Sequence, residues 1–204
     1  MDYLRALDLE RIQRVLSKEG GILIDLRPID DYLARHIPRS IPLLFESGPG
    51  LGGRARDLLP LDARLVLLED EASDLTESVD SFRGKGFEVT GYLEGGVDGW
   101  PDGDRAATPA IQLDEWKKGP LLNVNDPGTI PPDGALPIAT ERLWQRYQEI
   151  PAGAIGVLAG WGVRAAAAVG ILEYLGLREL TFVRTRPPAA KPPMAGPEVF
   201  RVGE

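Results

Sequence analysis

The sequence predicts an α/β fold built from two similar units, each an open, mainly parallel sheet flanked by helices. Apolar runs such as ILIDL (22–26) and RLVLL (64–68) are short and lack polar alternation, which is typical of strands buried on both faces of a parallel sheet. Stretches with helical periodicity separate these runs, so that strand and helix alternate. The same pattern returns later in the chain, which indicates an internal repeat.

The first unit begins with a helix over residues 9–18. Asp8 precedes LERIQRVLSK, in which Leu9, Ile12, Val15 and Leu16 fall on one helical face, and two glycines follow as a stop signal. The further elements expected up to residue 93 are a strand at 22–26, a short helical piece at 29–34, a glycine-rich loop at 48–53, a strand at 64–68, a helix at about 75–85 and a strand at 87–93.

The repeat becomes visible when the chain is aligned on itself. LRELTFVR follows Gly176 as FEVTGYLE follows Gly86, 90 residues earlier, and IGVLAGWGVRAAAAV then falls on LVLLEDEASDLTESV. The segment GWPDGDRAATPA is rich in Gly, Pro and Asp and marks the boundary between the units. We expect domains at 1–104 and 105–186, and an extended proline-rich tail at 187–204.

Composition excludes several classes of function. The net charge of −8 disfavours nucleic acid as a partner, because that affinity depends on Lys and Arg neutralising phosphates. No apolar stretch approaches the ~20 residues of a membrane helix, and the N-terminus does not read as a signal peptide, so we expect a cytoplasmic protein. The sequence contains no cysteine, which excludes disulfides, thiolate metal sites and thiol nucleophiles.

Two segments resemble motifs of the rhodanese (thiosulfate sulfurtransferase) family. LIDLRPIDDYLARHIPRSIPL (23–43) resembles the early strand-and-turn signature, and GYLEGGVDGW (91–100) resembles the closing motif. The second half resembles the family more weakly, through GALPI and VLAGWGVRAA, and lacks an equivalent of EGGVDGW. The resemblance implies tandem rhodanese-like domains.

In that family a cysteine ends a strand, opens a loop of the form Cys-x-x-Gly-x-Arg and carries sulfur as a persulfide. The resemblance places Glu69 at this position in the first domain, and the 90-residue repeat places Ala159 there in the second. Neither side chain can carry persulfide sulfur. Ordinary rhodanese catalysis is therefore not available to this chain alone, and we expect no cofactor.

The second loop, AGWGVR, keeps a glycine and an arginine at the family's positions. Its backbone N–H groups and Arg164 can form a site for sulfate, thiosulfate, phosphate or a carboxylate. Alternatively, the glycines only permit a tight turn, Arg164 makes a structural salt bridge and the tryptophan packs between domains. The candidate anion-binding residues are Gly160, Trp161, Gly162, Val163 and Arg164.

The first loop is acidic and would repel anionic sulfur donors. Its acids can instead interact with the dipole of the following helix, which Ser73 or Asp74 can cap. Alternatives are a docking patch for a basic partner or an oxygen-ligand site for Mg²⁺, although no metal is predicted. An acid/base site lacks a nearby His, Lys or Tyr. The candidate residues of this acidic loop are Glu69, Asp70, Glu71, Ser73 and Asp74.

Other residues resemble structural positions of the family. His36 resembles a turn histidine, and Asp25 is expected to pair with Arg27 or Arg39. Glu94, Gly95 and Gly96 are expected to shape the turn after the last strand, and Trp100, Trp116 and Trp144 to pack.

Three functional hypotheses remain open. The first is a catalytically inactive tandem rhodanese-like protein that binds or regulates a protein partner. The second is a receptor for a small anion. The third is a protein that contributes a binding pocket to sulfur chemistry while a partner supplies the thiol.

Overall fold

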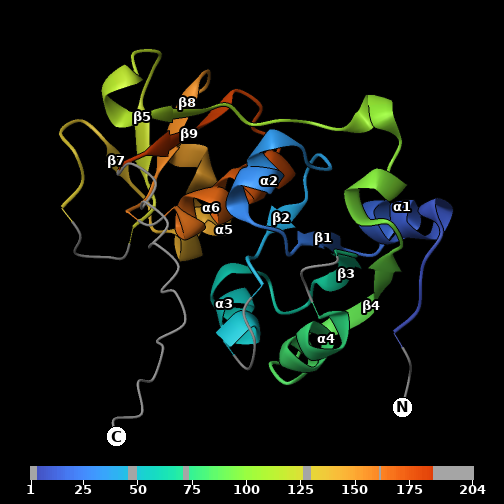
Figure 1. Ribbon diagram of the computed structural model, residues 1–204. Helices are drawn as coiled ribbons and strands as arrows, with labels where there is room; N and C mark the ends of the chain where they lie inside the picture. The colour runs from blue at the N-terminus through green and yellow to red at the C-terminus, as the bar shows by residue number, and fades with distance from the viewer. Residues whose placement is uncertain (1–3, 46–49, 71–73, 126–129, 161, 186–204) are drawn as a thin grey trace, which may run out of the picture.

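The computed structural model describes residues 4–45, 50–70, 74–125, 130–160 and 162–185. These residues form two parallel β-sheets with helices packed against them (Figure 1). The expected tail at 187–204 lies outside the described residues, as do Trp161, Glu71 and Ser73. Within the described ranges, no helix has the length and apolar character needed to span a membrane.

The first unit is built on a sheet with the strand order β2-β1-β3-β4. Successive side chains of β1 face opposite layers, as the pleat requires. Ile22 and Ile24 pack in the same core cluster as residues of α3 and α4, whereas Leu23 packs with residues of α1. The unit comprises α1 (Leu9–Lys18), β1 (Gly21–Asp25), α2 (Ile29–Ala34), β2 (Ile41–Pro42), α3 (Gly50–Leu58), β3 (Arg64–Leu68), α4 (Leu75–Arg83) and β4 (Glu88–Leu93).

Helix α1 begins and packs as the sequence predicts. The Asp8 carboxylate accepts a hydrogen bond from the Arg11 backbone N–H at 2.7 Å, which satisfies one free donor of the first turn. Ile12 and Val15 are fully buried, and Leu9 and Leu16 pack against the same cluster while partly exposed. Strand β1 begins and ends one residue earlier than expected, and α4 ends two residues earlier.

The expected glycine-rich loop at 48–53 is wrong from residue 50 onward, because helix α3 begins at Gly50. A Cβ at Gly52 would lie 2.1 Å from the Ser81 carbonyl oxygen of α4, so only glycine allows the two helices to approach this closely. The Gly52 N–H also donates to the Ser81 hydroxyl at 2.9 Å. Packing against α4 therefore offsets the low helix propensity of glycine.

The second unit repeats the strand order of the first. Its sheet has the order β5-β9-β8-β6-β7, in which β7-β6-β8-β9 corresponds to β2-β1-β3-β4. The second sheet has one additional edge strand, β5, which pairs with β9. In the first unit the backbone of Arg5 and Leu7 occupies the corresponding place, because it hydrogen-bonds to Tyr92 of β4. The unit comprises β5 (Ala110–Gln112), β6 (Leu121–Asn123), β7 (Leu136–Pro137), α5 (Leu143–Arg146), β8 (Ile155–Leu158), α6 (Val163–Tyr174) and β9 (Leu180–Arg184), with short 3-10 helices η3 (Leu113–Glu115), η4 (Thr140–Arg142) and η5 (Tyr147–Glu149).

Helix α6 joins the two units into one hydrophobic core. It packs against β2 of the first unit and β8 and β9 of the second (Figure 1). Most of its residues are buried. A Cβ at Gly170 would lie 2.7 Å from the Ser40 carbonyl oxygen, so a glycine is needed where α6 meets the segment leading into β2. The Trp144 indole N–H also crosses between the units and donates to the Leu58 carbonyl at 2.7 Å.

Candidate functional site

The loop that follows β8 carries the second predicted site. Ala159 directly follows the strand, and Gly162, in the left-handed region at φ 83°, precedes the first residue of α6. Two backbone N–H groups of the loop already have acceptors. Gly160 donates to the Asn125 side-chain oxygen at 2.9 Å, and Gly162 donates to the Ala159 carbonyl at 3.2 Å. These two donors are therefore not available to a bound anion.

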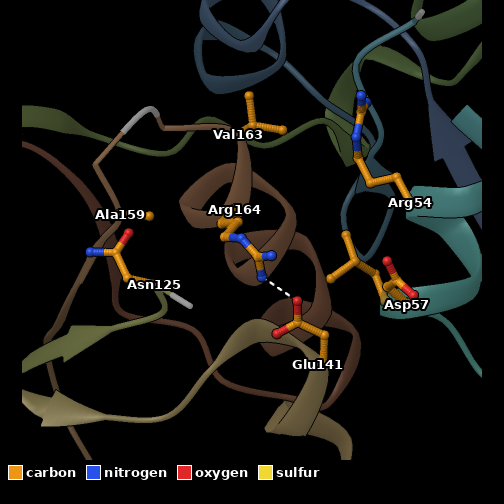
Figure 2. A pocket seen from close by; sticks show the side chains of 8 residues that line it. Arg54, Asp57, Asn125, Glu141, Ala159, Val163 and Arg164 are labelled. Carbon is orange, nitrogen blue, oxygen red and sulfur yellow. Dashed lines mark hydrogen bonds and ion pairs between the residues drawn. The ribbon is translucent and has the colours of Figure 1, made fainter. Parts of the chain in front are cut away.

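Arg164 projects from the first turn of α6 and forms an ion pair with Glu141 of η4 (Figure 2). The contact joins one guanidinium N–H to Oε1 of the carboxylate. The second carboxylate oxygen, Oε2, is buried and has no hydrogen-bond partner among the described residues. The structure thus places a carboxylate beside the arginine that the sequence suggested for anion binding.

A cavity of about 270 Å³ lies in front of this loop, between the two units. Helix α3 of the first unit contributes Arg54 and Asp57 to its lining (Figure 2). Leu58 of the same helix also lines the cavity. The second unit contributes Asn125, Glu141 and the loop residues Ala159, Val163 and Arg164. No feature of the sequence assigned α3 to this site, because the glycines at its start read as a loop.

The cavity lining contains as many positively charged as negatively charged side chains. Arg54 donates to the Leu44 carbonyl at 2.7 Å, and Arg164 is paired with Glu141. The Asp57 carboxylate makes no hydrogen bond or ion pair within the described part of the chain. Two guanidinium groups and two carboxylates therefore surround one space, and the acceptors that lack partners belong to the carboxylates.

The first predicted loop has a different local structure. The Glu69 carboxylate, directly after β3, accepts a hydrogen bond from the Gly95 N–H at 2.8 Å. A Cβ at Gly96 would lie 2.1 Å from the Glu69 carbonyl oxygen, so the turn after β4 needs a glycine there. Glu69 thus braces this turn, a connection that no feature of the sequence indicated.

The other described acids of this loop have identifiable surroundings. Asp74 caps α4, accepting from the Glu77 N–H at 3.0 Å, as the sequence suggested. The charge of Asp70 acts on Arg27. Among the described residues, no group of three or more His, Asp or Glu side chains is placed to hold a metal ion.

Asp25 pairs with Arg27 and not with Arg39. The Arg27 Nη2 lies 2.7 Å from Oδ2 of the fully buried carboxylate, and Nε lies 3.0 Å from Oδ1. Burial of Arg27 acts to lower its pKa, but the hydrogen bonds to Asp25 and the surrounding carboxylates outweigh burial and raise that pKa. Arg39 instead lies over the Tyr174 ring, 5.1 Å from its centre.

His36 has a partner that the sequence did not reveal. It is fully buried, and its Nε2 lies 3.1 Å from Glu173 of α6, 137 residues along the chain. Its Nδ1 lies 3.0 Å from the Tyr32 carbonyl oxygen. An acid within the otherwise apolar stretch GILEYLG was the signal that could have identified Glu173, because buried carboxylates require partners.

Comparison with known proteins gives a family match within the first unit. Residues 8–102 match the family described as Rhodanese-like domain. No curated protein matches the chain.

Several solved structures resemble the chain. A thiosulfate sulfurtransferase from Pseudomonas aeruginosa is 18% identical with a TM-score of 0.39, over 88% of this chain and 43% of that one. SseA from Escherichia coli, a 3-mercaptopyruvate sulfotransferase, is 16% identical with a TM-score of 0.35, over 87% of this chain and 96% of that one. An NAD-dependent persulfide reductase from A. fulgidus is 24% identical with a TM-score of 0.34, over 38% of this chain and 15% of that one. The chain thus spans less than half the length of the first and third of these.

Proposed function

We propose that this chain, whose residues 8–102 match the rhodanese-like domain, is a catalytically inactive tandem rhodanese-like protein that works by binding. The observation that carries the proposal is the identity of the residues that directly follow β3 and β8. Glu69 follows β3 and Ala159 follows β8, and the sequence contains no cysteine to replace them. Sulfur transfer through a persulfide requires a thiolate, which this chain cannot supply.

The second unit supports the tandem part of the proposal. Its strands repeat the order of the first sheet, and β8 lies 90 residues after the corresponding part of β3. On this proposal, 1–104 is the first rhodanese-like domain and 105–186 is a degenerate second copy. The shared core around α6 explains why the second copy persists without catalysis, since its loss would expose buried side chains of the first.

The position of the cavity supports binding as the function. In open parallel sheets, ligands bind beyond the carboxyl ends of the strands. The cavity lies there for the second unit, with Ala159 at the end of β8 in its wall. It is lined by charged and apolar side chains together, which can orient a small molecule without reacting with it.

A thiosulfate:cyanide assay on the pure protein tests the proposal. The Pseudomonas aeruginosa thiosulfate sulfurtransferase serves as the positive control, and thiocyanate is measured as the product. We expect no thiocyanate above the protein-free blank and, by mass spectrometry, no added sulfur on the chain after exposure to thiosulfate. Turnover by a sample free of contaminating enzyme would refute it.

A small anion such as sulfate is a second candidate ligand for the loop at 159–164. It is favoured by Arg164 and by the N-terminus of the 12-residue helix α6, where the dipole attracts negative charge. Isothermal titration with sodium sulfate tests it, and we expect any binding to require Arg164. Unchanged sulfate binding in an Arg164→Gln variant would place the anion elsewhere.

A further inference from the structure

A groove beside the outer edge of the first sheet is lined by arginines and lies apart from the cavity between the units. Strand β4 is the last strand of this sheet, and the N-terminal segment pairs with it at Tyr92. Residues 88–90, at the start of β4, line a cavity of about 490 Å³. The rest of the lining comes from the N-terminal segment, α1 and α4, namely Leu4, Arg5, Arg11 and Arg83.

Two of these arginines have no partner for their charge. Arg5 and Arg83 are exposed, and neither guanidinium makes a hydrogen bond or an ion pair among the described residues. The acid in the same lining, Glu88, is already paired, since its Oε2 lies 3.2 Å from Nε of Arg64. The groove thus carries uncompensated positive charge on a chain whose net charge is −8.

A second hollow, of about 340 Å³, extends the groove along α1. It shares Arg5 and Arg11 with the first hollow, so the two adjoin. Its two acids are engaged, because Asp8 caps α1 and Glu10 lies 3.0 Å from Arg14. The pair with Arg14 is exposed, and exposed pairs contribute little stability, so an incoming carboxylate can compete for this arginine. The four arginines of the two hollows, which we call the arginine track, are Arg5, Arg11, Arg14 and Arg83.

The form of the track favours a protein segment over a small molecule. Small-molecule pockets are mostly apolar and enclose their ligand, whereas both hollows of the track present more polar than apolar surface. An added β-strand is disfavoured, because the register of β4 shifts opposite Leu65 and Val66 and such irregularities disrupt edge pairing. What the track offers instead is a series of guanidinium groups, which match the geometry of carboxylates.

We propose that the arginine track binds an acidic segment of a partner protein. Carboxylates of the segment contact the guanidinium groups of Arg5 and Arg83, and a further carboxylate competes with Glu10 for Arg14. The inference rests on the proposed function only in that it names the kind of partner for a protein that works by binding. The track and the cavity between the units share no lining residue, so each can be tested by itself.

A fluorescein-labelled peptide of alternating glutamate and glycine tests the proposal. Fluorescence anisotropy of the labelled peptide measures its binding to the full chain at low salt. The matched peptide has glutamine in place of glutamate, which keeps the size and removes the charge. We expect the glutamate peptide to bind at least tenfold more tightly, and its affinity to fall as salt is added, because salt screens exposed charges.

Substitutions then locate the binding surface. Arg5→Gln and Arg83→Gln are each expected to weaken binding of the glutamate peptide severalfold, and the double variant at least tenfold. Arg178→Gln removes the same charge from an exposed position in the second unit and is the matched control, with affinity unchanged. Because neither Arg5 nor Arg83 has a side-chain partner among the described residues, the variants should keep the urea midpoint of the parent.

Several outcomes would overturn the inference. Equal affinity for the glutamine peptide would show that charge is not recognised, and an equal loss in Arg178→Gln would show that only net charge matters. A loss in Arg164→Gln but not in the double variant would place the peptide at the loop before α6. Tighter binding of single-stranded DNA of the same length would indicate a nucleic-acid surface. The thiocyanate assay decides the proposed lack of sulfurtransferase activity separately, since none of these variants adds or removes a thiol.

Discussion

His36 of the first unit and Glu173 of the second form a buried pair, with Nε2 and Oε2 3.1 Å apart. The same carboxylate oxygen accepts a hydrogen bond from the Arg39 backbone N–H at 3.3 Å. The imidazole stacks on the Tyr32 ring at 4.3 Å between centres. A buried polar contact thus crosses the junction between the units, where α6 meets the turn that precedes β2.

Removing the histidine should destabilise the whole protein. In His36→Ala the Glu173 carboxylate stays buried but loses its side-chain partner, a change that typically costs about 3–5 kcal/mol. Urea unfolding followed by tryptophan fluorescence measures the loss. Arg146→Ala, which breaks an exposed pair with Glu149, is the control and should cost about 1 kcal/mol or less. A loss below that of the control would show that the buried pair contributes little.

The two glycines at the centre of α3 should respond in opposite ways to alanine. Gly52→Ala places a methyl group against the Ser81 carbonyl and should destabilise by about 1–3 kcal/mol through overpacking. At Gly53 the added methyl group meets no atom within 4 Å, so Gly53→Ala should stabilise by about 0.5–1 kcal/mol through helix propensity. Thermal unfolding of both variants is the measurement. Stabilisation by both would mean that α3 and α4 do not pack this closely.

A cysteine introduced at Ala159 should not become an activated thiolate. Burial disfavours the charged form, Asn125 already occupies the Gly160 N–H, and Glu141 already pairs with Arg164. We expect the thiol pKa of Ala159→Cys to lie at or above the free value of about 8.5. The pH dependence of alkylation by iodoacetamide measures it, with Glu69→Cys as the comparison. A pKa between roughly 3.5 and 7.5 would instead favour an intact anion cradle.

Acid should weaken the contact between α1 and β3. Hydrogen bonding from Arg11 lowers the pKa of Glu19 despite the opposing effect of burial, and Arg64 lowers it further. Because the folded pKa lies below the ordinary value of 4.5, the unfolded chain takes up the proton first as the pH falls. The stabilisation from Glu19 is therefore complete above pH 4.5 and is lost as the pH drops through the folded value.

The variant Glu19→Gln tests this pH dependence. It should be less stable than the parent at pH 7, and the difference in urea midpoint should shrink at pH 3. Glu10→Gln, which changes an exposed pair with Arg14, is the control and should show little difference at either pH. A constant gap between parent and Glu19→Gln across this range would contradict the assignment.

Much of the fold could be read from local patterns. Apolar runs without alternation predicted β1 and β3, and Asp8 and Asp74 predicted the starts of α1 and α4. These features depend on residues within a few positions of one another, so the sequence displays them directly. Helix α3 could not be read in this way, because its glycines favour a loop until α4 packs against them.

The candidate site, like the fold, could be predicted from the sequence only in part. The sequence alone determined that no thiol exists, and the family resemblance with the 90-residue repeat placed Glu69 and Ala159 directly after two strands. Only the tertiary structure decided that Glu141 pairs with Arg164 and that Asp57 faces the same cavity. The reason is physical: strand patterns and caps follow from neighbouring residues, whereas the charge of a cavity depends on side chains brought together from separate parts of the chain by packing.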